Sequence, residues 1–274
     1  MSRGAEAESV SQQVAALAQR YSERADAYDR LWSPAIRPFG ERLISALPLA
    51  RAHEVIDVGT GAGALLPALR QAAPNATIVG VDNSEGMLRL ARSRHAGPLE
   101  LMNVEELTFG DAWFDIAVAA FVLFHLPHPE HCLAGIFRVL KPGGSVGIAT
   151  WGRERFPPVD TIWDETLMQM GAKTVRPPAT ENRACCDSES KVAALLEQAG
   201  FSASRVWGEP VVHRWDPELH FEHQVLATSR ARLESLDADR RARCLEQVHA
   251  RLQAATPDDY LYEGDVILAT AAKP

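Results

Sequence analysis

The stretch that decides the fold reads Asp57-Val58-Gly59-Thr60-Gly61-Ala62-Gly63. It closes an apolar run over residues 53–58, which is typical of a buried parallel strand, and precedes a helical pattern over residues 65–72. Its glycines allow a tight backbone turn and let a ligand approach the main chain closely. The first turn of the following helix offers free N–H groups to anionic ligand atoms. The stretch therefore predicts a ligand-binding loop between a strand and a helix.

The alternation of strand and helix continues on both sides of this loop. Strands are expected over residues 53–58, 76–81, 99–102, 114–121, 145–151, 201–207 and 265–271. Helices are expected over residues 8–28, 39–47, 65–72, 129–140 and 191–198, and one more is expected to begin at a capping Ser84. Lys141-Pro142-Gly143-Gly144 is expected to form a turn. Strict alternation predicts a doubly wound α/β fold with a mostly parallel, seven-stranded sheet and right-handed crossovers.

Two long stretches interrupt the alternation and are expected to form helical cap insertions, at residues 152–187 and 209–262. Loops of this length commonly cover a site. We expect a single domain built around them. Its other parts are a helical lid at 1–47, the ligand-binding core at 53–151, and two segments that complete the core, at 188–208 and 263–274.

Composition narrows the classes of partner. The 274 residues include 28 Lys and Arg against 36 Asp and Glu, a net charge of −8 that disfavours nucleic acid as a partner. No apolar stretch approaches a membrane span, and no signal-peptide pattern is recognisable, so a cytoplasmic protein is expected. No metal site is expected, because zinc-ligand spacing is absent from the four cysteines, Cys132, Cys185, Cys186 and Cys244.

Two acidic residues flank the glycine loop in the predicted sheet. Asp82 ends the second strand, where a carboxylate can accept hydrogen bonds from two ribose hydroxyls. Gly59, Gly61 and Ala64 also satisfy the loose dinucleotide-binding pattern, so a nicotinamide-dependent oxidoreductase is one alternative. Asp57, however, lies inside an apolar strand and requires a partner such as a ligand ammonium group. A pyrophosphate near that acid would be repelled, which favours a cationic adenosine cofactor.

The run Phe114 to Leu126 and the segment Leu140 to Gly144 complete the pattern that begins with the glycine loop and the two acids. With them, the sequence resembles a class I S-adenosylmethionine (SAM)-dependent methyltransferase, in the branch similar to the ubiquinone/menaquinone C-methyltransferases (UbiE-like). The resemblance is strongest over residues 53–151. It implies SAM as cofactor, S-adenosylhomocysteine (SAH) as product and a small-molecule acceptor, with carbon or oxygen favoured and nitrogen or sulfur possible. A monomer or homodimer is expected. The alternatives are a SAM-binding regulator or non-methylating enzyme, and an NAD(P)-dependent oxidoreductase.

The resemblance implies a set of cofactor-binding residues. They are Tyr28, Asp57, Gly59, Thr60, Gly61, Asp82, Asn83, Met87, Asn103, Val104, Glu105 and Phe121. Within this set, Asp57, Gly59 and Gly61 are expected to line the methionine part of the cofactor. Asp82 is expected to hold the ribose.

The other expected contacts surround the adenine and the two ends of the methionine part. Asn83 and Met87 are expected beside the adenine. Asn103 stands where the family commonly has aspartate, and its carbonyl oxygen can still accept a hydrogen bond from the exocyclic amine. Phe121 is expected near the sulfonium, and Tyr28, in the lid, near the cofactor carboxylate.

Catalysis of methyl transfer requires an acceptor that is held close and in line, with water excluded. A base is needed only if the acceptor must lose a proton. His125 is the best candidate, because it lies just past the fourth strand on the ligand side of the sheet. An unperturbed histidine titrates near neutral pH, which suits this role.

Overall fold

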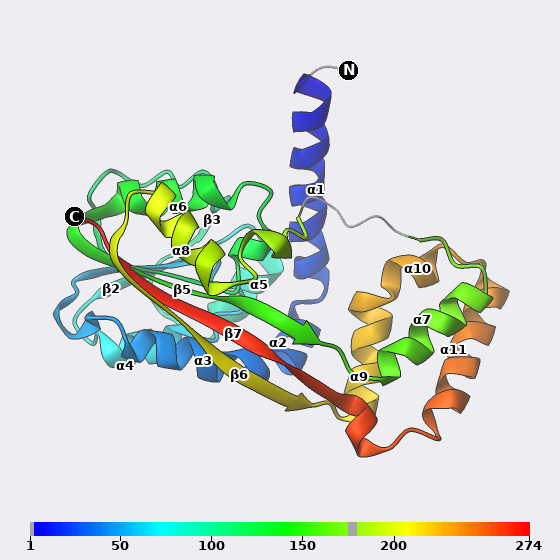
Figure 1. Ribbon diagram of the computed structural model, residues 1–274. Helices are drawn as coiled ribbons and strands as arrows, with labels where there is room; N and C mark the ends of the chain where they lie inside the picture. Colours follow the sequence, from blue (N-terminus) through cyan, green and yellow to red (C-terminus); the bar gives the residue numbers. More distant parts are fainter. Residues whose placement is uncertain (1–2, 175–179) are drawn as a thin grey trace. The chain divides into compact units, whose positions relative to one another are not determined.

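The computed structural model describes residues 3–174 and 180–274 and divides into two compact units (Figure 1). The core unit comprises Met1–Arg153, Pro178–Glu209 and Val266–Pro274, and the insertion unit comprises Glu154–Pro177 and Pro210–Asp265. The insertion unit contains parts of both expected cap insertions, and the division of the chain into a lid, a core and caps stays a prediction. Part of the first expected insertion, from residue 180 to residue 187, belongs instead to the core unit, and its residues 175–179 lie outside the described residues.

The sheet has seven strands in the order β3-β2-β1-β4-β5-β7-β6. They are β1 (Glu54–Val58), β2 (Thr77–Asp82), β3 (Leu99–Leu101), β4 (Phe114–Ala120), β5 (Leu140–Arg155), β6 (Ser202–Arg214) and β7 (Leu261–Ala272). The pairs β1–β2, β1–β4, β2–β3 and β4–β5 are parallel. Strand β7 runs antiparallel to β5, since Gly143 bonds to Lys273 near one end and Glu154 to Tyr262 near the other. The predicted doubly wound, seven-stranded fold is confirmed.

Helices cover both faces of the sheet in the core unit. They are α1 (Arg3–Glu23), α2 (Ala25–Leu31), α3 (Ser33–Ser45), α4 (Leu66–Ala72), α5 (Glu85–Ala91), α6 (Pro129–Val139) and α8 (Glu189–Gln198). Figure 1 shows α6 and α8 on one face, with α3 and α4 on the other. The predicted cap of α5 is confirmed, because the Ser84 hydroxyl accepts the Met87 N–H at 3.3 Å. Short 3₁₀ turns are η1 (Leu49–Arg51), η2 (Leu123–His125) and η3 (Arg183–Cys185).

The N-terminal segment differs from the expected pattern. The expected helix over 8–28 is two helices, which meet at Arg24. The helix expected from residue 39 begins at Ser33, so neither of its prolines stops it. Pro34 lies in the first turn, where a missing N–H is tolerated, and Pro38 lies inside the helix. The packing of buried Phe39 outweighs the local preference of Pro38.

The expected turn at residues 141–144 is instead an irregularity within β5. Phe114 of β4 pairs with Leu140, and Ile116 pairs with Ser145, so β5 has extra residues between two consecutive pairs. Gly143 adopts a φ of 78°, which glycine reaches without strain. The glycines therefore permit a bulge in a continuous strand, where the sequence suggested a boundary.

The insertion unit is mainly helical. Its helical segments are α7 (Val159–Gln169), α9 (Pro217–His223), the π-helical η4 (Gln224–Thr228), α10 (Arg230–Glu234), α11 (Ala238–Leu252) and the 3₁₀ turn η5 (Pro257–Tyr260). Trp163, Leu233 and Val248 are buried in its own hydrophobic core. Asp160 accepts hydrogen bonds from Gln224 and pairs with the His220 ring, each at 2.7 Å. These contacts give the unit an interior separate from that of the core unit.

Candidate functional site

A cavity of the core unit opens beside the glycine loop, at the carboxyl ends of β1, β2 and β4. Ligands of doubly wound proteins bind at this edge of the sheet. The cavity has about 1060 Å³ of empty space, part of it open to solvent, which is at the upper end for small-molecule sites. Its lining includes every site residue named from the sequence, Tyr28, Asp57, Gly59, Thr60, Gly61, Asp82, Asn83, Met87, Asn103, Val104, Glu105, Phe121 and His125.

Other lining residues were not named from the sequence as site residues. Three of them, Val14, Leu17 and Tyr21, lie at helical spacing along one face of α1. The remaining ones are Ser33, Ile36, Arg37, Ala62, Ala64, Leu65, Ala120, Val122 and Leu126. The apolar spacing in α1 was visible in the sequence, but it did not reveal that this face lines a cavity instead of packing in the core.

The glycine loop brings the backbone into the cavity. Gly59 and Gly61 have φ values of 74° and 54°, in the left-handed region that favours glycine. The N–H groups of Gly59 and Thr60 both bond to the Val81 carbonyl, at 2.8 and 2.9 Å, so the loop is tied to β2. A Cβ at Gly59 would lie 2.6 Å from Val122 Cγ2, whereas one at Gly61 would meet nothing within 4 Å. The loop is packed at Gly59 and open to a ligand at Gly61.

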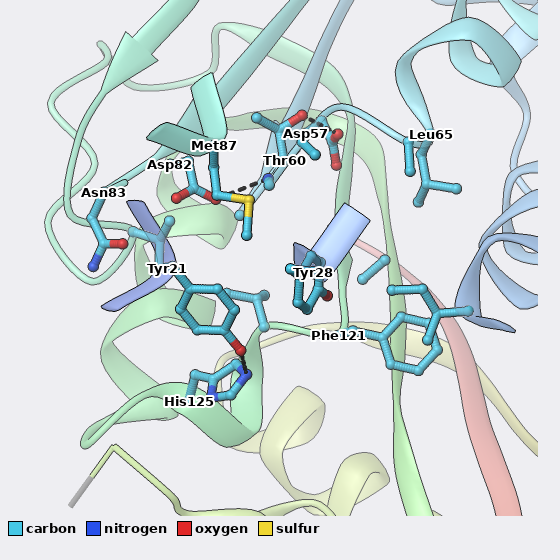
Figure 2. Close-up of a pocket in the computed structure, with 18 of the residues that line it drawn as sticks. Tyr21, Tyr28, Asp57, Thr60, Leu65, Asp82, Asn83, Met87, Phe121 and His125 are labelled. Carbon is cyan, nitrogen blue, oxygen red and sulfur yellow. Dashed lines mark hydrogen bonds between the residues drawn. The ribbon is translucent and has the colours of Figure 1, made fainter. Parts of the chain in front are cut away.

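Asp57 is a buried carboxylate at the base of the cavity. Its side chain belongs to β1, is 2% exposed, and accepts a 2.6 Å hydrogen bond from the Thr60 hydroxyl (Figure 2). Burial raises its pKa to about 6, and the charge of Asp82 adds to this shift. A cationic ligand group beside Asp57 would stabilise the ionised form, because an opposite charge nearby favours it.

Asp82 ends β2 and lies on the other side of the loop. Its Oδ2 accepts the Gly61 N–H at 2.8 Å, and its Oδ1 accepts the Ser84 N–H at 2.9 Å. Burial raises the pKa of this carboxyl as well. Each oxygen keeps lone-pair capacity for a further donor, such as a ligand hydroxyl. The two acids and the open loop therefore fit a ligand that carries both a cation and a diol.

The loop after β3 is braced by its own polar side chains. Asn103 Oδ1 accepts the Glu105 N–H at 3.1 Å, and Glu105 Oε1 accepts the His128 N–H at 2.6 Å. The Asn103 oxygen expected to read an adenine amine thus accepts one bond within the loop and keeps a second lone pair. Its amide NH₂ group is a further donor that could meet a ring nitrogen. The adenine contact of Asn103 stays a prediction.

Phe121 follows β4 with an unusual backbone. It has a φ of 57°, although it is not glycine, and such a conformation costs about 1–3 kcal/mol. Its N–H bonds to the Ala149 carbonyl at 2.7 Å, and its ring lies 5.0 Å from that of Trp151. Strained residues that the surrounding structure maintains cluster at functional sites. This strain therefore marks the end of β4 as part of the site.

The N-terminal helices pack over the glycine loop and α5. A Cβ at Gly86 would lie 2.3 Å from the Ser22 carbonyl oxygen, so the two backbones approach closely there. The Ser22 hydroxyl also lies 2.8 Å from that of Ser84. Asp29 pairs with Arg94, which donates to the Ala62 carbonyl at 2.7 Å. These contacts hold Tyr21 and Tyr28 against the cavity.

His125 lies in η2 with its Nε2 atom 2.8 Å from the Tyr21 hydroxyl oxygen (Figure 2). Its Nδ1 atom is buried without a hydrogen bond of good geometry among the described residues. Burial lowers the pKa of His125 to about 3, although the Thr180 backbone acts to raise it. Burial also raises the pKa of Tyr21 to about 12. The near-neutral pKa for which His125 was proposed as a base is therefore not expected in this site, and its catalytic role stays a prediction.

The described residues contain neither a metal-binding cluster nor a membrane-spanning helix. No group of three or more histidine, cysteine or acidic side chains there is arranged to hold a metal ion. In the same part of the chain, no helix has both the length and the apolar character needed to cross a membrane.

Comparison with known proteins identifies the family. A family model described as "Methyltransferase domain" matches residues 56–148. A ubiquinone/menaquinone biosynthesis C-methyltransferase UbiE from Ralstonia pickettii is 30% identical over 166 residues, 55% of this chain and 68% of that protein. A malonyl-[acyl-carrier protein] O-methyltransferase from Pectobacterium atrosepticum is 30% identical over 149 residues, 54% of this chain and 58% of that protein.

Solved structures agree on the fold. The YcgJ protein from Bacillus subtilis superposes with a TM-score of 0.56 at 20% identity, over 86% of this chain and 98% of that protein. At this identity, the likeness is one of fold alone. The sequence relatives also support SAM as the cofactor, so the oxidoreductase alternative is wrong. The chain belongs to the UbiE-like class I SAM-dependent methyltransferases.

Proposed function

We propose that this SAM-dependent methyltransferase acts on a largely apolar small molecule, at carbon or oxygen. The observation that carries the proposal is the composition of the cavity. The buried carboxylate of Asp57 and the half-buried one of Asp82 stand beside the open glycine loop. Apolar side chains such as Val14, Leu17 and Leu126 line another part of the cavity. The relatives include a C-methyltransferase and an O-methyltransferase by name, which supports both acceptor atoms and favours carbon.

The cofactor-binding roles proposed from the sequence fit this composition. Bound SAM supplies an electrophilic methyl group on a sulfonium. Asp57 would hold its ammonium group, and Asp82 would accept its two ribose hydroxyls. Met87 is 2% exposed and packs with Ala62, so it offers an apolar surface for an adenine ring. Asn83, Asn103, Val104 and Glu105 would complete that end, from the loops after β2 and β3.

Tyr28 and Phe121 would enclose the methionine part together with Gly59, Thr60 and Gly61. Aromatic ring faces attract cations, which suits a sulfonium. The chain's contribution to rate is then to orient the acceptor in line and to exclude water. Neither task requires a covalent intermediate on the protein.

The other parts of the proposal concern partners and the insertion unit. The net charge of −8 argues against nucleic acid as the acceptor. We propose a monomer or homodimer in the cytoplasm, and a role for the insertion unit as a cap that contributes to acceptor specificity.

Calorimetric titration with SAM, SAH and NADH tests the cofactor site. Binding of SAM and SAH without NADH is expected. Asp82→Ala should weaken SAM binding by about 1–3 kcal/mol, the range for hydrogen bonds to a buried charged group. Asp258→Ala is the matched control, because it removes an exposed carboxylate paired with Arg214. Equal SAM affinity of the Asp82 variant and this control would contradict the ribose assignment.

Transfer of an isotopically labelled methyl group tests the acceptor class. A panel of hydroquinones, phenols and apolar carboxylic acids should include accepted compounds, and NMR of the product distinguishes carbon from oxygen methylation. Labelling of nucleic acid in preference to every small molecule would refute the proposed class.

A further inference from the structure

Tyr21 and His125 form a hydrogen-bonded pair at the cavity. The Tyr21 hydroxyl oxygen lies 2.8 Å from His125 Nε2, and the two rings meet edge to face with centroids 5.4 Å apart. Tyr21 comes from α1 and His125 from η2, so the pair joins the N-terminal helix to the end of β4. Both residues line the cavity.

Only one atom of this pair is placed to bind a ligand. His125 Nδ1 is buried, and its Nε2 is occupied by Tyr21. The Tyr21 oxygen, by contrast, retains at least one free lone pair, whichever of the two groups donates the shared hydrogen. A ligand in the cavity can therefore reach the pair through Tyr21, while His125 acts through Tyr21.

The surroundings of Tyr21 indicate what such a ligand carries. Val14 and Leu17 precede Tyr21 on the same face of α1, and Leu126 follows η2. A molecule lying along these side chains would contact apolar surface near the Tyr21 oxygen. A ligand hydroxyl there could donate a hydrogen bond to the free lone pair of Tyr21, whereas a ligand without a hydroxyl group would leave Tyr21 bonded to His125 alone.

We propose that Tyr21 is the residue that orients the methyl acceptor, by a hydrogen bond to an oxygen on an otherwise apolar molecule, and that His125 positions Tyr21. The inference rests on the proposed function and assigns the polar contact to Tyr21 in place of His125. It makes Tyr21 a specificity-determining residue for acceptors that carry a hydroxyl group.

Ligand binding without turnover tests the proposal. The full chain is loaded with SAH, and 1-naphthol and naphthalene compete at equal concentrations in a saturation-transfer NMR experiment. Wild type should prefer 1-naphthol, and Tyr21→Phe should reduce that preference by about threefold to tenfold, the effect of one net hydrogen bond. Tyr262→Phe is the matched control, since it removes a hydroxyl with an equal 2.8 Å hydrogen bond to Glu154, outside the cavity lining.

The part played by His125 is read from combined variants. His125→Leu should lose most of the preference, and His125→Gln, whose amide can still bond to Tyr21, should restore part of it. Because His125 acts through Tyr21, adding His125→Leu to Tyr21→Phe should change nothing further. A further loss in that double variant would show that His125 touches the ligand itself and would overturn the assignment.

The remaining outcomes separate this proposal from the proposed function. Failure of wild type to bind SAH would refute the cofactor site. Normal SAH binding with no preference for 1-naphthol, or a preference that survives in Tyr21→Phe, would overturn the acceptor contact alone. A Tyr21→Phe variant that loses SAH affinity and keeps its naphthol preference would assign Tyr21 to the cofactor and would also overturn it.

Discussion

Asp57 should make the ligand-free protein less stable as the pH rises, and Asp57→Asn should remove this effect. The carboxyl is 2% exposed, and its pKa in the folded protein is about 6, above the unfolded value near 3.8. The folded state therefore binds the proton more tightly than the unfolded state. Stability is lost as the pH rises from below the unfolded pKa to above the folded one. The Asn side chain keeps an oxygen for the Thr60 hydroxyl but carries no charge.

The magnitude follows from the two pKa values. The 2.2-unit difference between about 6 and 3.8 corresponds to about 3 kcal/mol at roughly pH 7.5, and to about 1 kcal/mol at roughly pH 4.5. Asp57→Asn should thus stabilise the ligand-free protein by up to about 3 kcal/mol at the higher pH and by less at the lower one. Because the charge is proposed to hold the ammonium group of SAM, the same variant should bind SAM more weakly.

Urea unfolding of wild type and Asp57→Asn at both pH values measures this effect. Asp115→Asn is the contrasting control, since hydrogen bonds from Lys141 and two backbone N–H groups hold the Asp115 pKa below its usual range. That variant should be destabilised at neutral pH. The reasoning would be refuted if Asp57→Asn had the wild-type free energy of unfolding at both pH values. It would also be refuted if the substitution raised this free energy more at the lower pH than at the higher one.

Three other predictions concern the loop, the lid and the polar pair. Gly59→Ala should lower the free energy of unfolding by about 1–3 kcal/mol, because it combines left-handed strain with a Cβ 2.6 Å from Val122; urea unfolding that matches wild type would contradict this. Gly86→Ala should displace α1, since its Cβ would lie 2.3 Å from the Ser22 oxygen; limited proteolysis should then cut α1 faster, and an unchanged rate would count against that packing. The pH dependence of the methyl-transfer rate should show no ionisation of His125 between about pH 5 and 9, because the pKa of His125 in the folded protein is about 3. An inflection near neutral pH that disappears in His125→Gln would contradict this prediction.

The strand alternation was readable from the sequence because buried parallel strands are continuous apolar runs between turn residues. The runs around Ile56 and Ala117 are strands, as expected, and lie side by side in the sheet. Errors arose where packing outweighed local preference. Pro38 does not interrupt α3, and Gly143 bends β5 without ending it.

The fold class, the family and part of the cavity lining could be predicted from the sequence alone. These follow from short-range patterns: a glycine loop after a strand, and single acids such as Asp57 and Asp82 at strand ends. All parallel strands end at one edge of the sheet, so residues in those positions must come together.

Only the tertiary structure decided the environment of each side chain. Tyr21 and His125 are 104 positions apart, and no local pattern indicates that they share a hydrogen bond. The pKa of His125 depends on burial by segments distant in sequence, as does that of Asp57. Solvent exclusion and long-range contacts arise only when the chain has folded, and they decide which of the site's polar groups is charged and which is free to bind a ligand.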